Sequence, residues 1–224
     1  MIANASHYIR KGGDQSVAGR IAPPVKVVLF DFGGVIAAEG FREGLLAIAR
    51  SNGLPPEAFF EMAGSLIYES GYVVGRANER SYWDLIRRRS GIGQSDADLR
   101  KEILQRFVLR PWMLEIVRAF RRSGYLVGIL SDQTQWLDDL DRRDHFFAEF
   151  NVVFNSYHLG RGKKDPQVFD DVAKKLGVMP SEIFFIDDNE GNIQRARSRG
   201  LQALLFRDKD SFLRELAELH LVPA

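Results

Sequence analysis

Five short apolar segments along the chain have the composition of buried β-strands. They are rich in β-branched and aromatic residues and lie at residues 25–30, 126–130, 152–154, 183–186 and 203–206. Helical patterns alternate with them, among them residues 113–122, 167–176 and 189–199. Strands that alternate with amphipathic helices form βαβ units, in which helices cover both faces of a parallel sheet. The pattern therefore predicts an α/β fold with a doubly wound parallel-sheet core.

The first two predicted strands are separated by about 100 residues, far more than one crossover requires. This interval contains one short strand-like piece at residues 71–74 and four amphipathic stretches, at residues 42–51, 55–68, 79–90 and 95–107. We therefore expect a helical insertion over residues 39–109 between two parts of one core, residues 25–38 and 110–224. Residues 1–24 are mixed and polar, and we expect them to form a flexible leader.

Composition narrows the possible functions. The 224 residues include no cysteine, which excludes disulfides, thiolate metal sites and a cysteine nucleophile. A formal net charge of +1 gives no reason to expect binding to nucleic acid or to a membrane surface. No apolar run approaches the ~20 residues of a membrane-spanning helix. The composition is typical of a soluble cytoplasmic protein, and it leaves the oligomeric state open.

Polar residues directly follow three of the predicted strands. Asp31 ends the first strand, Ser131 and Asp132 follow the second, and Asp187 and Asp188 follow the fourth. Because the carboxyl ends of parallel strands meet at one edge of the sheet, where open α/β folds hold their ligands, we expect these side chains to converge. Carboxylates without a nearby histidine or thiolate favour Mg²⁺ over zinc. The sequence thus predicts an acidic, metal-type site.

Each of these signals also has a simple structural interpretation. Ser131 is a candidate N-cap for a helix over residues 133–140, and Asp188 or Asn189 for a helix over residues 193–199. Lys163 and Lys164 lie in a basic loop ahead of the helical run at residues 167–176, where an ordinary solvated lysine is the alternative. No single segment distinguishes a functional site from these structural roles; the occurrence of all of them in this order favours the functional interpretation.

Taken in order, the segments resemble the four motifs of the haloacid dehalogenase-like (HAD) hydrolase superfamily, over roughly residues 25–207. The resemblance implies that Asp31 is the catalytic nucleophile, Ser131 a phosphate-binding hydroxyl and Lys163 the cationic group. The lysine is placed by its distance to Phe169, because the family motif reads Lys-Pro-Asp-Pro-x-x-Phe. Lys164 stands where the first proline usually is and is a possible substitute. The insertion after the nucleophile motif resembles the helical cap of subclass I.

The resemblance also implies binding residues and a reaction. Substrate contacts would come from Ser131, Asp132, Lys163, Gly33 and Gly34. Mg²⁺ would be held by Asp31, Asp187, Asp188 and the backbone carbonyl of Gly33. The expected reaction is Mg²⁺-dependent hydrolysis of a small phosphomonoester, such as a sugar phosphate, through an aspartyl-phosphate on Asp31. The expected partner is therefore a small phosphorylated metabolite, not nucleic acid or a membrane.

One position departs from the family pattern. Phosphatases of this superfamily usually read Asp-x-Asp, and the second aspartate protonates the leaving group and later activates water; here that position is Gly33. General acid–base catalysis typically supplies a factor of about 10² to 10⁴, and no residue of the sequence obviously replaces it. Relatives with Asp-x-Gly resemble this chain and include sugar-1-phosphate phosphatases, whose anomeric leaving groups depend less on protonation. We therefore expect substrates whose leaving groups need little protonation.

Two other functions stay open at this point. L-2-haloacid dehalogenases share the nucleophile, serine and lysine, attack carbon without a metal, and also lack the second aspartate. Against this, Asp187 and Asp188 form a metal-type pair, and Gly33 and Ser131-Asp132 replace the aromatic and serine-asparagine residues that dehalogenases typically carry. The third possibility is a catalytically silent protein that holds a phosphorylated ligand. Metal dependence separates the first two functions, and turnover of any substrate separates both from the third.

Overall fold

The computed structural model describes residues 24–219 and 221. The leader expected at residues 1–24 lies, except for Pro24, outside the described residues. Five parallel strands form one sheet in the order β3-β2-β1-β4-β5. They are β1 (Val27–Phe30), β2 (Leu126–Ser131), β3 (Val152–Asn155), β4 (Ile183–Asp187) and β5 (Gln202–Leu205). All five predicted strands are therefore present, and β1, which is followed directly by Asp31, is central.

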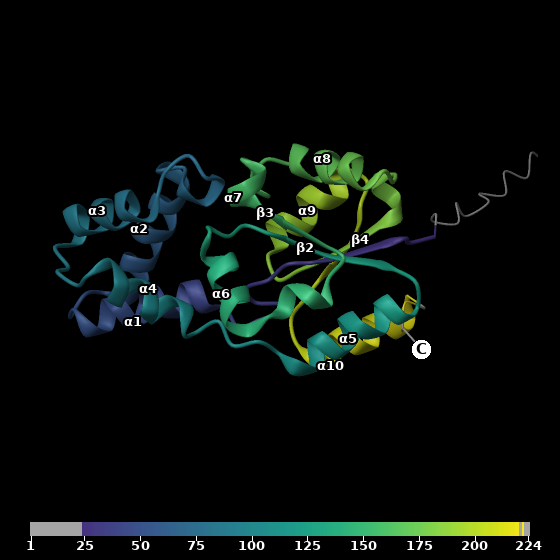
Figure 1. Cartoon of the computed structure of the whole chain (residues 1–224), viewed down its shortest axis with the longest axis horizontal. Helices are drawn as coiled ribbons and strands as arrows, with labels where there is room; N and C mark the ends of the chain where they lie inside the picture. Colours follow the sequence, from purple (N-terminus) through teal and green to yellow (C-terminus); the bar gives the residue numbers. More distant parts are fainter. Residues whose placement is uncertain (1–23, 220, 222–224) are drawn as a thin grey trace, which may run out of the picture.

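Helices cover both faces of this sheet, as Figure 1 shows. The helices of the core are α5 (Pro111–Arg122), α6 (Trp136–Asp144), α7 (Ser156–Leu159), α8 (Gln167–Leu176), α9 (Glu190–Ser198) and α10 (Lys209–Glu218). Side chains of β1 alternate between the two faces of the sheet: Val28 and Phe30 pack on the face covered by α5 and α10, and Val27 and Leu29 on the face covered by α8 and α9. The predicted doubly wound α/β core is confirmed.

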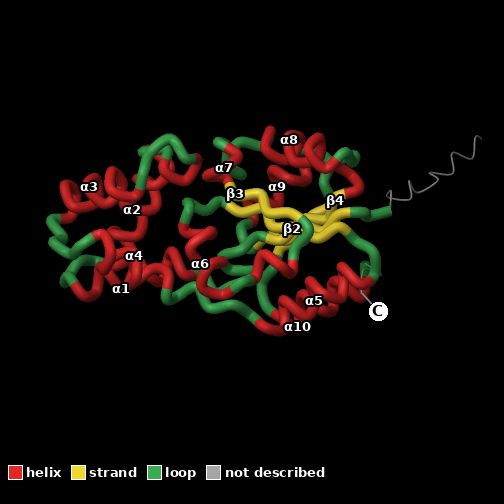
Figure 2. The backbone as a smooth tube through the Cα atoms, viewed as in Figure 1, coloured by secondary structure: helices red, strands yellow, loops and turns green. Residues whose placement is uncertain are grey.

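The insertion between β1 and β2 is helical, and we call its four helices the cap. They are α1 (Gly40–Ser51), α2 (Pro56–Glu69), α3 (Glu79–Ser90) and α4 (Asp96–Leu104). Figure 2 shows them as a separate group beside the strands, and α1 packs against both α2 and α4. Across the described residues, no helix is both long and apolar enough to cross a membrane.

The strand-like piece noted at residues 71–74 is not a strand. This piece forms a single 3₁₀ turn, Tyr72–Val74, between two glycines in the left-handed region, Gly71 at φ 78° and Gly75 at φ 70°. Tyr72 and Val73 are buried in the main hydrophobic core. Their apolar character therefore reflects burial of a turn, which a run of three apolar residues does not distinguish from a strand.

The two segments that join the cap to the core lie side by side. Ala37 and Leu109 form an antiparallel bridge, and the N–H of Ala38 donates to the carbonyl of Val108 at 2.9 Å. Both segments meet just beyond the carboxyl end of β1. The cap therefore stands over the edge of the sheet where Asp31 emerges.

Candidate active site

A cavity of about 530 Å³ lies between the cap and the carboxyl edge of the sheet. Its core side includes Asp31, Ser131 and Asp188, which were expected to converge at the strand ends, and Lys163 of the basic loop. Its cap side includes polar and aromatic residues of α1 and α2, among them Phe41, Arg42, Phe60, Glu61, Ser65 and Tyr68. Substrate would therefore be enclosed by both parts of the molecule.

Lys163 joins two of the predicted carboxylates. Its Nζ lies 2.8 Å from Oδ2 of Asp31 and 2.6 Å from Oδ2 of Asp187, and the side chain is 1% exposed. Burial alone would lower the pKa of this ammonium, but the carboxylates around it, with Asp187 the strongest, raise the pKa of Lys163 above its usual value. Lys163 therefore stays charged at neutral pH and fixes the orientation of Asp31, whose Oδ1 accepts the N–H of Phe32 at 2.7 Å.

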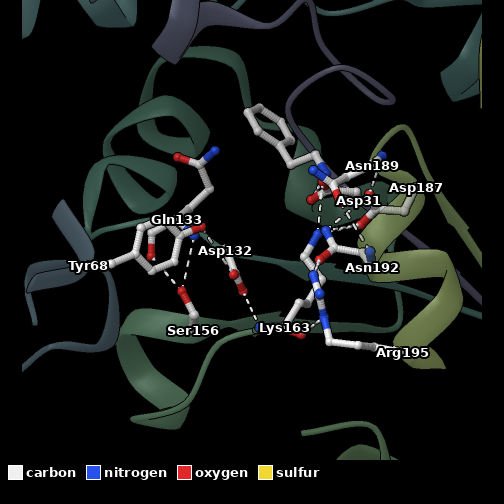
Figure 3. Close-up of polar contacts among 11 residues, drawn as sticks. Asp31, Tyr68, Asp132, Gln133, Ser156, Lys163, Asp187, Asn189, Asn192 and Arg195 are labelled. Atoms are coloured by element: carbon white, nitrogen blue, oxygen red, sulfur yellow. Dashed lines mark hydrogen bonds and ion pairs between the residues drawn. The ribbon is translucent and has the colours of Figure 1, made fainter. Parts of the chain in front are cut away.

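Asp187 is fully buried and its carboxylate is already occupied by donors, as the dashed lines in Figure 3 show. Besides Lys163, the backbone N–H of Asn189 donates to Oδ1 at 2.7 Å, and the Asn192 amide reaches both oxygens at 3.1 and 3.2 Å. The Asn192 amide is itself held, because Nη2 of Arg195 donates to its oxygen at 2.6 Å. This network makes Asp187 a rigid anchor for the lysine.

Asp188, in contrast, is exposed at the cavity. One ligand oxygen each from Asp31, Asp187 and Asp188 lie within 4.8 Å of one another. Gly34 packs directly against this group: its φ is 79°, and a Cβ at this position would lie 1.8 Å from Oδ2 of Asp188. Glycine is required here both by the backbone conformation and by the close approach of the carboxylate.

The three carboxylates of the cluster outnumber the one ammonium among them, and Arg110 also acts electrostatically on Asp188. Burial raises the pKa of Asp31 to about 8; Lys163 opposes this rise, whereas Asp187 and Asp188 add to it. Burial and then the charge of Asp187 also raise the pKa of Asp188. A group of hard oxygen donors with excess negative charge fits a divalent cation such as Mg²⁺.

Two structural alternatives from the sequence can be compared with the helix ends. Ser131 does not cap α6, because that helix begins at Trp136, whose N–H donates to Oγ1 of Thr134 at 3.2 Å. Ser131 is instead buried in the cavity wall. The cap of α9 is Asn189, which leaves Asp188 free of that structural role.

The remaining predicted residues are divided between the cavity and its supports. Asp132 lies in the cavity wall, but its Oδ1 accepts the N–H of Lys163 at 2.8 Å and so holds the basic loop. Lys164 also lines the cavity, but its Nζ lies over the ring of Tyr68, 3.3 Å from the ring centroid, rather than at Asp31. Gly33 lines the cavity, whereas Gly34 supports Asp188 from behind. The geometry thus brings Lys163, not Lys164, to Asp31.

Glu39 is a cavity residue that the sequence analysis missed. It is the N-cap of α1, where its Oε1 accepts the N–H of Arg42 at 3.2 Å. It lines the cavity together with Asp31 and Gly33. Burial, then the charge of Asp188, raises the pKa of Glu39. The only signal in the sequence was an acidic residue at the start of the insertion, which is also what an ordinary helix cap looks like.

Known proteins share this architecture. Residues 25–200 match the haloacid dehalogenase-like hydrolase family. The chain is 33% identical over 121 residues to bifunctional epoxide hydrolase 2 of Rattus norvegicus; the match covers 51% of this chain and 21% of that protein. It is 24% identical over 213 residues to flavin mononucleotide hydrolase 1 of Arabidopsis thaliana, covering 92% of this chain and 81% of the relative.

A solved structure shows the same fold. A HAD family enzyme from Bacteroides thetaiotaomicron, in complex with magnesium and inorganic phosphate, superimposes with a TM-score of 0.67 at 23% sequence identity, covering 84% of this chain and 98% of that one. The family match spans most of the described residues. It includes the cap and strands β1 to β4, and it ends before β5. The chain therefore belongs to the haloacid dehalogenase-like hydrolase family.

Proposed function

We propose that the protein is a Mg²⁺-dependent phosphatase that hydrolyses a small phosphomonoester through an aspartyl-phosphate on Asp31. One observation carries the proposal: Asp31 lines the cavity, is held by the buried ammonium of Lys163, and lies in a three-carboxylate cluster suited to a divalent cation. The magnesium and phosphate bound to the Bacteroides enzyme of the same fold support this interpretation.

Each residue of the cavity has a role in this proposal. Asp31 attacks phosphorus and forms the covalent intermediate, which splits one difficult displacement into two easier ones. The Lys163 ammonium offsets negative charge on Asp31 and on the phosphoryl oxygens, and the Ser131 hydroxyl donates a hydrogen bond to one of them. Asp31 follows β1, Ser131 ends β2 and Lys163 lies in the loop ahead of α8, so the three groups together position the phosphoryl group before the reaction begins.

The metal would be held by Asp31, Asp188 and the carbonyl of Gly33. Asp187 already accepts hydrogen bonds from several groups, and we assign it to positioning Lys163 instead. When bound, Mg²⁺ supplies neutralisation of the charge that develops on the transferring phosphoryl group. The Asp-x-Gly motif and the polar residues Arg42, Glu61 and Ser65 of the otherwise largely apolar cap wall support a sugar phosphate as substrate, and a volume of about 530 Å³ suits a small metabolite.

The test is a panel of phosphorylated metabolites assayed with Mg²⁺ and with excess EDTA, together with the variant Asp31→Asn. We expect release of phosphate only with Mg²⁺, and Asp31→Asn to fall below a tenth of wild-type turnover because it lacks the attacking carboxylate. Asp84→Asn, which removes a carboxylate from α3 outside the cavity wall, is the matched control and should keep wild-type turnover.

Other outcomes would support the competing functions. Chloride release from 2-chloropropionate in EDTA would identify a dehalogenase. Tight binding of phosphorylated ligands without turnover of any substrate would identify a silent binding protein. Phosphatase activity that persisted in Asp31→Asn would contradict the covalent mechanism.

A further inference from the structure

The space that a side chain at Gly33 would occupy is filled by a carboxylate from another element. A Cβ built on Gly33 would lie 2.9 Å from Oε2 of Glu39, with Phe107 and Gln133 as its next neighbours at 3.3 and 3.5 Å. Gly33 does not have a positive φ; in this turn Gly34 does. The glycine at position 33 is therefore not required by the backbone, but it does leave room for Glu39.

Glu39 is held so that one oxygen caps a helix and the other faces this space. Its Oε1 accepts the N–H of Arg42 at the first turn of α1, and Oε2 is the oxygen nearest to the Gly33 position. The residue belongs to the segment that joins the cap to the core, and it lines the same cavity as Asp31 and Lys163. A substrate that reaches Asp31 therefore enters a cavity that Glu39 also faces.

We propose that Glu39 is the general acid and base of this site, in place of the aspartate that Gly33 lacks. The inference rests on the proposed phosphatase function. In the first step, the bond from Asp31 to phosphorus forms, the bond to the leaving oxygen breaks, and that oxygen takes the proton of the Glu39 carboxyl. In the second step, the Glu39 carboxylate takes a proton from water as the water oxygen attacks phosphorus and Asp31 leaves.

This role changes the expected range of substrates. Without an acid, hydrolysis would be restricted to esters with good leaving groups, as the sequence alone led us to expect. With Glu39 beside the Gly33 position, esters of ordinary alcohols are substrates as well, because their poor leaving groups receive a proton. The substrate class therefore extends to phosphate esters of primary alcohols, including sugars phosphorylated on a primary hydroxyl.

The test compares leaving groups within single variants. Glu39→Gln keeps the shape and an oxygen that can cap α1 but cannot transfer the proton. We expect kcat/KM for glycerol 3-phosphate to fall by about 10² to 10⁴, and kcat/KM for p-nitrophenyl phosphate, whose leaving group needs little protonation, to fall far less. Glu43→Gln removes the same charge from the same helix outside the cavity wall, and it should leave both values unchanged.

A relocation variant tests the geometry directly. In the double variant Gly33→Asp with Glu39→Ala, residue 33 instead of residue 39 supplies the carboxyl to the same space. This double variant should turn over glycerol 3-phosphate at least ten-fold faster than Glu39→Ala alone. The ratio of the two substrates in one preparation does not depend on the fraction of folded protein. A poorly folding variant therefore still reports on the proposal.

The outcomes separate this proposal from the one on which it rests. If the wild-type protein hydrolyses both esters and Glu39→Gln leaves kcat/KM for each of them unchanged, the role of Glu39 is overturned and the phosphatase function stands. Equal losses for both substrates would show that Glu39 only positions the cap. Wild-type protein that hydrolyses neither ester nor any other phosphomonoester would refute the phosphatase function and the role of Glu39 together.

Discussion

Gly34 is needed both for the left-handed backbone conformation of its turn and for the close approach of Asp188, a proposed metal ligand, and Gly34→Ala tests both requirements. Its φ of 79° lies in the left-handed region, where an alanine costs roughly 1 to 2 kcal/mol. The added Cβ would also lie 1.8 Å from Oδ2 and 2.5 Å from Cγ of Asp188. Real Cβ contacts are essentially never closer than 3.0 Å, so the Asp188 carboxylate must move by more than an ångström.

Gly53→Ala supplies a matched control for the backbone strain. Gly53 also has a left-handed φ, 65°, but a Cβ there meets nothing within 4 Å. It lies in the loop between α1 and α2, outside the cavity wall. Both variants should therefore lose about 1 to 2 kcal/mol in free energy of unfolding from backbone strain, and Gly34→Ala should lose more because its Cβ also displaces Asp188, as measured by urea denaturation without metal.

Only Gly34→Ala should weaken the metal site. Displacing a metal ligand through its neighbour typically lowers affinity by a factor of about 10 to 100. Titration calorimetry with Mg²⁺ should show this loss in Gly34→Ala and not in Gly53→Ala, and the concentration of Mg²⁺ needed for half-maximal phosphatase activity should rise by the same factor. Equal Mg²⁺ affinity in the two variants would refute the assignment of Asp188 as a ligand.

Two further predictions concern charge. Lys163→Met should abolish turnover and lower the free energy of unfolding by about 3 to 5 kcal/mol, because it leaves buried carboxylates without their cation. Lys164→Met should lower the free energy of unfolding by less than about 1 kcal/mol. Urea denaturation measures the stability of each variant, and kcat measures its turnover. The Glu182 carboxylate pairs with Lys26 at 2.6 Å, and this contact lowers its pKa below the usual 4.5. Because the native pKa is the lower one, the stabilisation is complete above about pH 5 and is lost as the pH falls through the native pKa. Urea midpoints measured from about pH 7 to pH 3 should therefore show a gap between wild type and Glu182→Gln that closes on acidification; a constant gap would contradict this assignment.

The order of strands and helices could be predicted from the sequence because its signals are local. A buried parallel strand is a short apolar run, and an amphipathic helix repeats its apolar positions every three to four residues. The helical run at Gln167–Leu176 has the bounds that the pattern predicts. The insertion was predicted as well, because about 100 residues between two strands exceed any single crossover. In contrast, helix α10 (Lys209–Glu218) was not predicted.

The candidate residues at the strand ends could also be predicted, because parallel pairing brings the carboxyl ends of strands to one edge. Asp31, Ser131 and Asp188 line the same cavity for this reason. Their chemistry follows from side-chain type, which the sequence states directly. The conformation of the turn after Asp31 did not follow from the sequence, which has two adjacent glycines there: in the structure Gly34 has a positive φ and Gly33 does not.

Sequence alone thus determined the fold, the cap and the acidic edge of the sheet, since each follows from local pattern and from the geometry of parallel strands. Tertiary structure decided which of two adjacent lysines reaches Asp31, because one residue along a loop changes the direction of the side chain. It also decided that Glu39 of the cap faces the space left by Gly33. That contact joins a helix end to a strand end, and its distance is set by the packing of cap on core rather than by any local pattern.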